Sequence, residues 1–151
     1  MNSIKGEIKM NIYKIDNHDE IITNSQINKI VRLAMFNPTD GRVKTVADGI
    51  YGKQQGSFYV CEMEGIVGII GVKRVDNAYV QIMHLAVEEE YRKQGIAKAL
   101  LEYVKQAERV DEILVETDGK DLKVLKKLGF RFKKEDDNRT GLVRFIGRQE
   151  G

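Results

Sequence analysis

Apolar residues follow two different spacings along the chain, and each spacing predicts its own kind of element. Short runs rich in β-branched and aromatic residues predict strands, whereas apolar residues three or four positions apart predict helices. The predicted strands cover residues 10–15, 57–63, 66–75, 78–87, 112–117, 130–134 and 141–147. The predicted helices cover residues 19–36, 43–51, 96–109 and 120–128.

The order of these elements is β-α-α-β-β-β-α-β-α-β-β, which indicates an α/β fold built on a mixed sheet. Short turns at residues 64–65 and 76–77 join the strands between 57 and 87 into an antiparallel meander. The helix after residue 95 then connects strand 78–87 to strand 112–117. A β-helix-β connection of this length is the normal route to a parallel pair. We therefore expect a mostly antiparallel sheet with one parallel strand pair.

Length and charge limit the domain organisation and the class of partner. The 151 residues suffice for one domain with one core, which we place at residues 10–151, with residues 1–9 as a loose extension and Met10 as its start. A formal net charge of +2, from 25 basic and 23 acidic residues, argues against nucleic acid as the main partner. A basic cluster at residues 120–134 leaves nucleic-acid contact as a less favoured alternative.

Cysteine content and hydropathy bear on the compartment. The single cysteine, Cys61, excludes a disulfide within the chain, so a cytoplasmic protein is expected. Cys61 lies in a strand-like run, where a buried thiol is favoured over a catalytic one. No run approaches the ~18–20 apolar residues that cross a bilayer, and the polar first nine residues do not form a signal peptide. No membrane association is predicted.

The most informative segment follows the strand that ends at Val87. Three glutamates lead to the sequence Arg92-Lys-Gln-Gly-Ile-Ala97, and an amphipathic helix begins directly after Gly95. The first turn of such a helix presents free backbone N–H groups, and small residues let an anion approach them. Arg92, Lys93 and Lys98 add positive charge at the positive end of the helix dipole. We interpret this segment as a pyrophosphate cradle; an ordinary helix start is the alternative.

The combination resembles the coenzyme A signature of the Gcn5-related N-acetyltransferase (GNAT) superfamily. The resemblance lies in the strand residues 83–87 and the segment 91–97, and the order of elements is similar across essentially the whole domain. It implies that acetyl-coenzyme A lies in a V between strands 78–87 and 112–117. The coenzyme-binding residues that it implies are Leu85, Ala86, Val87, Arg92, Lys93, Gln94, Gly95, Ile96, Ala97, Lys98, Asp121 and Leu125.

The reaction implied by the resemblance is attack of a primary amine on the thioester in a ternary complex, with no metal. An amine of pKa near 10 is mostly protonated at neutral pH, so a base is required. Glu116, at the end of a central strand, is the best candidate; a solvated ion-pairing carboxylate is the alternative. His84 is a weaker candidate. It alternates with Ile82 and Ala86, which predicts a face opposite Gln81, and a hydrogen-bonded structural role is favoured for it.

The second half of the resemblance departs from the family at one position. Residues 116–130 follow a family pattern that ends in Gly129 and Phe130, but Leu125 stands where the family usually carries the tyrosine that protonates the departing thiolate. Three explanations stay open. The thiolate leaves without a donor, Tyr91 or Thr117 supplies the proton, or the protein binds acyl-coenzyme A with little or no catalysis.

The acceptor is not specified by the sequence beyond an amine, on a small molecule or a protein. The segment 36–56 and the last two strands are expected to determine it. Asp40, Asp48 and Glu62 are acidic residues that could attract a cationic amine. A homodimer is compatible with a small domain that has sheet edges, although no residue pattern specifies one.

Overall fold

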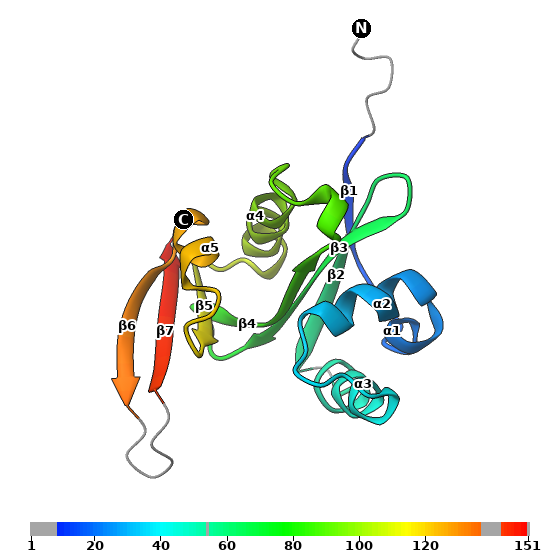
Figure 1. Ribbon diagram of the computed structural model, residues 1–151, viewed down its shortest axis with the longest axis horizontal. Coiled ribbons are helices and arrows are strands. Elements are labelled where there is room, and N and C mark those ends of the chain that lie inside the picture. Colours follow the sequence, from blue (N-terminus) through cyan, green and yellow to red (C-terminus); the bar gives the residue numbers. More distant parts are fainter. Residues whose placement is uncertain (1–8, 54, 137–142, 151) are drawn as a thin grey trace, which may run out of the picture.

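The computed structural model describes residues 9–53, 55–136 and 143–150 and is built on one twisted seven-stranded sheet (Figure 1). The strands are β1 (Asn11–Lys14), β2 (Gly56–Glu62), β3 (Ile66–Arg74), β4 (Tyr79–Val87), β5 (Glu112–Thr117), β6 (Arg131–Asp136) and β7 (Val143–Glu150). They lie in the order β1-β2-β3-β4-β5-β7-β6. Only β4 and β5 pair in parallel among these described strands. The predicted fold class and its single parallel pair are confirmed.

Helices cover both faces of the sheet. They are α1 (Glu20–Thr23), α2 (Ser25–Leu33), α3 (Asp40–Val46), α4 (Ile96–Glu108) and α5 (Leu122–Lys127). A π-helical turn, η1 (Ala47–Tyr51), continues α3, and a 3₁₀ turn, η2 (Glu89–Tyr91), follows β4. None of the helices in the described ranges is long and apolar enough to cross a membrane.

The buried side chains form two apolar clusters, one on each face of the sheet. The α4-side cluster contains α4 residues such as Leu100 and Val104, together with Leu125 and Phe130 from the following segment. The α2-side cluster is formed by α1, α2, α3 and η1 against the other face, and its members are Ile15, Ile21, Ile27, Ile30, Val31, Val43, Ala47, Tyr51, Phe58, Val60, Ile66, Ile69 and Ala86. Membership in these clusters shows which way each strand residue faces.

The first predicted helix is wrong in one respect, because the chain breaks it at Asn24. Asn24 is extended (φ −84°, ψ 113°), and its side-chain oxygen accepts hydrogen bonds from the amides of Gln26 (3.0 Å) and Ile27 (3.1 Å). Asparagine favours such an N-cap because its short side chain satisfies two amides that lack partners in the first turn. The segment expected as one helix, residues 19–36, is therefore two helices, and residues 34–36 lie beyond the second.

Other predicted elements need smaller changes. The second helix begins at Asp40 rather than residue 43, because Thr39 accepts a hydrogen bond from the amide of Arg42. Cys61 is fully buried, as expected, and burial raises the pKa of its thiol. The proposed N-terminal extension and the first residues of the last predicted strand lie largely outside the described residues.

Candidate functional site

The central feature of the candidate site is a gap between β4 and β5. The two strands pair only from Tyr79 opposite Glu112 to Gln81 opposite Leu114, although β4 continues to Val87 and β5 to Thr117. Beyond the last pair, β4 stays paired with β3 and β5 with β7. The edge of β4 from residue 82 to residue 87 therefore faces β5 without pairing to it, and Figure 1 shows the two strands diverging.

Helix α4 begins at the open end of this gap. Its N-cap, Gly95, is left-handed (φ 82°), a conformation that glycine adopts without steric cost. A Cβ placed there would meet nothing within 4 Å. Among the described residues, no side chain caps the first turn of α4. The N-terminus of a 13-residue helix thus faces open space with its first amides available.

Two side chains of the loop before α4 form hydrogen bonds with main-chain carbonyls at and just after the end of β4. Arg92 donates a hydrogen bond from Nε to the carbonyl of Val87 (3.0 Å), and Gln94 donates from Nε2 to the carbonyl of Glu90 (3.3 Å). Lys93 adopts a positive φ of 63°, which is uncommon for a residue with a side chain. The structure thus brings the predicted strand residues 85–87 and the predicted loop residues 92–98 to one end of the gap.

A β-bulge in β4 changes which residues share a face. His84 pairs with Gly71 and Ile82 with Val72, so Met83 is an extra residue in β4. Ile82 belongs to the α4-side cluster, whereas Ala86 belongs to the α2-side cluster. The prediction that His84 shares a face with Ile82, opposite Gln81, is wrong because simple alternation fails at the bulge. His84 lies on the α2 side, the same face as Gln81.

The structure gives His84 a buried hydrogen-bond partner. Its Nδ1 lies 2.6 Å from the hydroxyl of Tyr51, and its side chain is 7% exposed. Burial lowers the pKa of His84 to about 4 and raises the pKa of Tyr51. The imidazole is therefore neutral near pH 7, and the expectation of a hydrogen-bonded histidine is confirmed.

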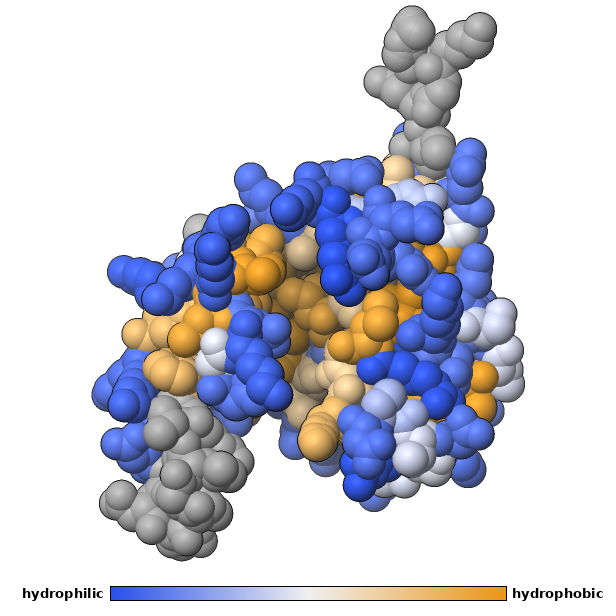
Figure 2. All heavy atoms as spheres, in the orientation of Figure 1, coloured by the Kyte–Doolittle hydropathy of each residue, from blue (hydrophilic) through white to orange (hydrophobic). Residues whose placement is uncertain are grey.

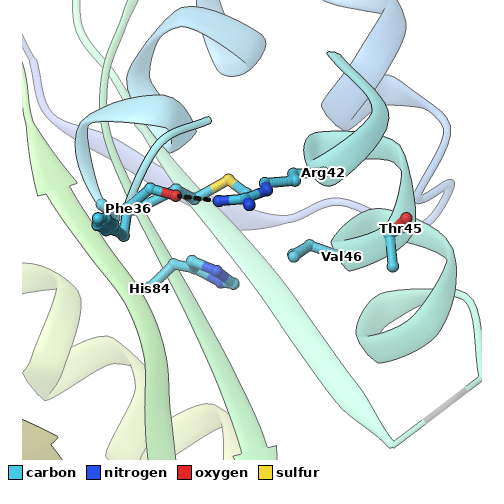
Figure 3. A pocket seen from close by; sticks show the side chains of 7 residues that line it. Phe36, Arg42, Thr45, Val46 and His84 are labelled. Atoms are coloured by element: carbon cyan, nitrogen blue, oxygen red, sulfur yellow. Dashed lines mark hydrogen bonds between the residues drawn. The ribbon is translucent and has the colours of Figure 1, made fainter. Parts of the chain in front are cut away.

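The His84 ring also lines a pocket of about 390 Å³ on the α2 side of the sheet. Its other lining residues come from the end of α2, the following loop and α3: Ala34, Met35, Phe36, Arg42, Thr45 and Val46. Figure 3 shows the His84 ring directed toward Val46, with the Arg42 side chain reaching from α3 toward Phe36. In Figure 2 the molecule is hollowed between α1–α3 and the β5–β7–β6 side, and hydrophobic side chains line the hollow.

Glu116 lies on β5 beyond the last residue that pairs with β4. Its neighbour Val115 points into the α4-side cluster, so Glu116 points to the opposite face, the same face as Gln81 and His84. Its side chain is exposed and takes part in an interaction with the rest of the protein. Gln81, His84 and Glu116 therefore share one face of the sheet at the gap.

Four further side chains, those expected near the coenzyme or its departing thiolate, have different surroundings. Leu125 is 6% exposed and packs in the α4-side cluster, and Tyr91 lies half-buried against the same cluster. Asp121 is exposed at the start of α5. The hydroxyl oxygen of Thr117 accepts a hydrogen bond from the amide of Gly119 (3.2 Å). Leu125 is thus part of the apolar core at the position where the family pattern has tyrosine.

Sequence reasoning named the segment 36–56 as part of the acceptor region but did not single out Tyr51 or Arg42 within it, and it missed Met35. The glycine at position 71 was a possible sign of the contact with Tyr51. A glycine within a strand can mark the close approach of another group, and a Cβ at Gly71 would overlap the Tyr51 hydroxyl. No pattern in the sequence joined the loop after α2 to the middle of β4.

One cluster of possible metal ligands also went unnoticed. His18, Asp19 and Asp48 offer three ligand atoms within 4.8 Å of one another. Asp48 accepts a hydrogen bond from Nζ of Lys44 (2.8 Å), and its carboxylate lies 3.4 Å from Nε2 of His18.

Comparison with known proteins identifies the architecture. Residues 54–132 match the family model described as an acetyltransferase (GNAT) domain. Human N-acetyltransferase 8 is 39% identical over 77 residues, which cover 44% of this chain and 34% of that protein. The chain therefore spans about a third of the length of that relative.

Two solved structures share the fold over nearly the full chain. One is a GNAT family acetyltransferase from Elizabethkingia anophelis with acetyl-CoA bound (TM-score 0.68, 18% identity, 94% of this chain and 98% of that chain). The other is an IAA acetyltransferase from Bacillus cereus ATCC 14579 (TM-score 0.65, 19% identity, 95% and 100%). Identities this low bear on the fold alone.

Proposed function

Because the chain belongs to the GNAT acetyltransferase family, we propose that it transfers an acetyl group from acetyl-coenzyme A to a primary amine by direct attack in a ternary complex. The observation that carries this proposal is the gap between β4 and β5, which leads directly to the open N-terminus of α4. An extended edge and a helix N-terminus together suit a ligand with an amide-containing arm and a pyrophosphate. The structure of a similar acetyltransferase with acetyl-CoA bound supports the choice.

The roles of the binding residues follow from the main chain. The unpaired edge of β4 at Leu85, Ala86 and Val87 would bind the pantetheine arm as an added strand. The amides from Lys93 to Lys98 would bind the pyrophosphate, and the exposed Lys93 and Lys98 would neutralise part of its charge. Arg92 contributes charge as well, while its Nε holds the loop against Val87.

The chemistry requires proton transfer as well as positioning. The amine nitrogen forms a bond to the thioester carbonyl carbon, the carbon–sulfur bond breaks, and the thiolate leaves with the bonding pair and is protonated. Because the amine enters mostly as an ammonium ion, the overall reaction releases one proton. Glu116 is the proposed base, since its carboxylate lies beyond the last β4–β5 pair on the same face as His84. His84, neutral near pH 7, is the second candidate.

The buried Leu125 favours one alternative function. Leucine cannot donate a proton, so a protein that binds acetyl-coenzyme A without appreciable transfer would leave this position apolar. A coenzyme thiol of pKa near 8–9 is, however, a fair leaving group without help. Tyr91, half-buried beside the loop, would be a substitute donor. An assay of thiol release that depends on added amine separates the enzyme from the binder.

The first experiment is calorimetric titration with acetyl-coenzyme A of the wild type, Gly95→Glu and Gly95→Ala. Both variants place a side chain at a left-handed residue, at similar strain, but only glutamate adds a negative charge beside the proposed pyrophosphate. We expect Gly95→Glu to bind about 10–100-fold more weakly, or ~1.4–2.8 kcal/mol, and Gly95→Ala to lose much less. Equal affinities of the two variants, or no binding by the wild type, would contradict the proposed site.

A further inference from the structure

The pocket beside His84 differs from the rest of this face in its mixture of side chains. Ala34, Met35, Phe36 and Val46 give it an apolar lining, and the Phe36 side chain is 82% exposed there. A large exposed ring beside an apolar wall is a surface that a ligand can cover. A pocket of about 390 Å³ suits a small molecule.

Among the described residues, the only charged side chain that lines this pocket is cationic. Arg42 makes two long contacts from Nη1 to main-chain carbonyls, those of Phe36 (3.5 Å) and Asn37 (3.4 Å). Within the described ranges, no carboxylate forms an ion pair with Arg42. His84 is neutral near pH 7 and adds no charge. The pocket therefore offers a guanidinium without a charged partner in this part of the chain, next to apolar surface.

The acidic residues that could have attracted a cationic acceptor are engaged elsewhere. Asp40 forms an ion pair with Arg32 (2.5 Å), and Asp48 accepts a hydrogen bond from Nζ of Lys44 (2.8 Å). Glu62 accepts a hydrogen bond from the Tyr13 hydroxyl (2.7 Å), and burial together with this bond raises the pKa of that phenol to about 12. None of the three lines the pocket. The charge distribution here disfavours an acceptor that carries several positive charges.

From the guanidinium of Arg42, which forms no ion pair with a carboxylate in the described ranges and lies beside the apolar wall of Phe36 and Met35, we infer that the acceptor is a small amine that carries a carboxylate and an apolar side chain, in the class of the α-amino acids. The carboxylate binds Arg42, whose planar fork matches two carboxylate oxygens. The apolar side chain covers Phe36. The amine is then directed toward His84 and the gap between β4 and β5. This inference rests on the proposed acetyl transfer and names its acceptor.

The test compares L-phenylalanine with phenethylamine, which has the same ring and amine but lacks the carboxylate. Thiol release from acetyl-coenzyme A is measured for the wild type, Arg42→Gln and Lys44→Gln. Lys44 is the matched control, since it is an exposed cation on the same helix that does not line the pocket. Because the two amines differ in intrinsic reactivity, the informative quantity is the change in the ratio of their kcat/KM values on mutation.

We expect the wild type to prefer phenylalanine, and Arg42→Gln to lower that preference by about 10–100-fold, the range for loss of a charge-assisted hydrogen bond. Lys44→Gln should keep the preference. Spermidine and tobramycin complete the panel as polycationic acceptors, and both should be poor substrates.

The failures of the two proposals are distinguishable. Efficient acetylation of spermidine, tobramycin or phenethylamine, or a preference that Arg42→Gln leaves unchanged, would overturn the inferred acceptor class while keeping acetyl transfer. Thiol release with none of the amines, in a protein that binds acetyl-coenzyme A, would overturn both. A melting temperature of Arg42→Gln equal to that of the wild type shows that the substitution acts on the pocket rather than on folding.

Discussion

The Tyr51 hydroxyl lies 2.6 Å from Nδ1 of His84 and joins the π-helical turn after α3 to the middle of β4. The contact fixes the histidine ring at the floor of the pocket, 33 residues away in sequence from its partner. Two features of the sheet make it possible. The bulge at Met83 turns His84 to the α2 side, and Gly71, opposite His84 on β3, leaves space for the Tyr51 ring.

Replacing Gly71 with alanine should therefore destabilise the protein through Tyr51. The added Cβ would overlap the Tyr51 oxygen, and the buried ring has to move away from His84. We expect a loss of about 1–3 kcal/mol in the free energy of unfolding, as for other overpacked cores. Urea denaturation of the wild type and Gly71→Ala measures this change in the free energy of unfolding.

Gly41→Ala is the control for this change. Gly41 lies in α3, where an added Cβ would meet nothing within 4 Å, so alanine should stabilise the helix by about 0.5–1 kcal/mol. If Gly71→Ala and Gly41→Ala had equal free energies of unfolding, the Tyr51 ring could move away from His84 without destabilising the protein.

Titration of His84 should make the fold less stable in acid. Burial lowers the pKa of His84 from 6.5 to about 4, so between these values the unfolded chain binds a proton that the folded protein does not. The contribution of His84 to the free energy of unfolding is therefore fully present above pH 6.5. It is lost as the pH falls toward 4, and the loss amounts to at most about 3 kcal/mol. Urea denaturation of wild type and His84→Gln at pH 7.5 and pH 4.5 isolates the contribution.

The comparison with His84→Gln removes the effects of other titrating groups. The wild type should lose more stability between the two pH values than the variant does. An equal loss in both proteins would show that the imidazole is protonated at the same pH in the folded and unfolded chains.

The sequence was sufficient for the fold because its signals were local. Strand, three glutamates, Gly95 and an amphipathic helix follow one another within residues 82–108, and the structure forms them in that order. The parallel pair followed from the length of the connection alone. Strand β5 matches its predicted bounds because its apolar run is flanked by polar residues at both ends.

The arrangement of the pocket could not be predicted in the same way, because it depends on contacts between distant segments. A single extra residue at Met83 reverses the facing of every later residue in β4, and nothing in the local sequence marks it. The break at Asn24 is similar. Apolar residues continue through it at helical spacing, but a capping side chain ends one helix and begins the next. Arg42 and Phe36 line one pocket with His84 through contacts between segments that are distant in the sequence.

The burial of Leu125 predicts a stability role that its exposed neighbour does not share. Leu125 is 6% exposed in the α4-side cluster, whereas Val124 on the same helix is 61% exposed. Leu125→Ala should lower the free energy of unfolding by about 2–5 kcal/mol, and Val124→Ala should have little effect. Urea denaturation of both variants gives the comparison, and similar losses would place Leu125 outside the core.

Replacing Glu116 with glutamine tests the proposed base. The variant keeps the shape of the side chain but cannot accept the ammonium proton, so kcat at pH 7 should fall by about 10²–10⁴-fold, while the affinity for acetyl-coenzyme A stays close to that of the wild type. The deficit should narrow as the pH approaches the pKa of the amine, near 10, because more of the amine then enters without its proton. Thiol release across the pH range and calorimetry measure the two effects.

Glu112→Gln is the matched control, since Glu112 lies on the same strand and face but at the paired end, away from the gap. It should keep the pH–rate profile of the wild type. If Glu116→Gln also keeps that profile, the carboxylate is not the base, and His84 becomes the stronger candidate because it lies on the same face and is neutral at pH 7. A profile altered by His84→Gln and not by Glu116→Gln would assign proton transfer to the imidazole that Tyr51 holds in place.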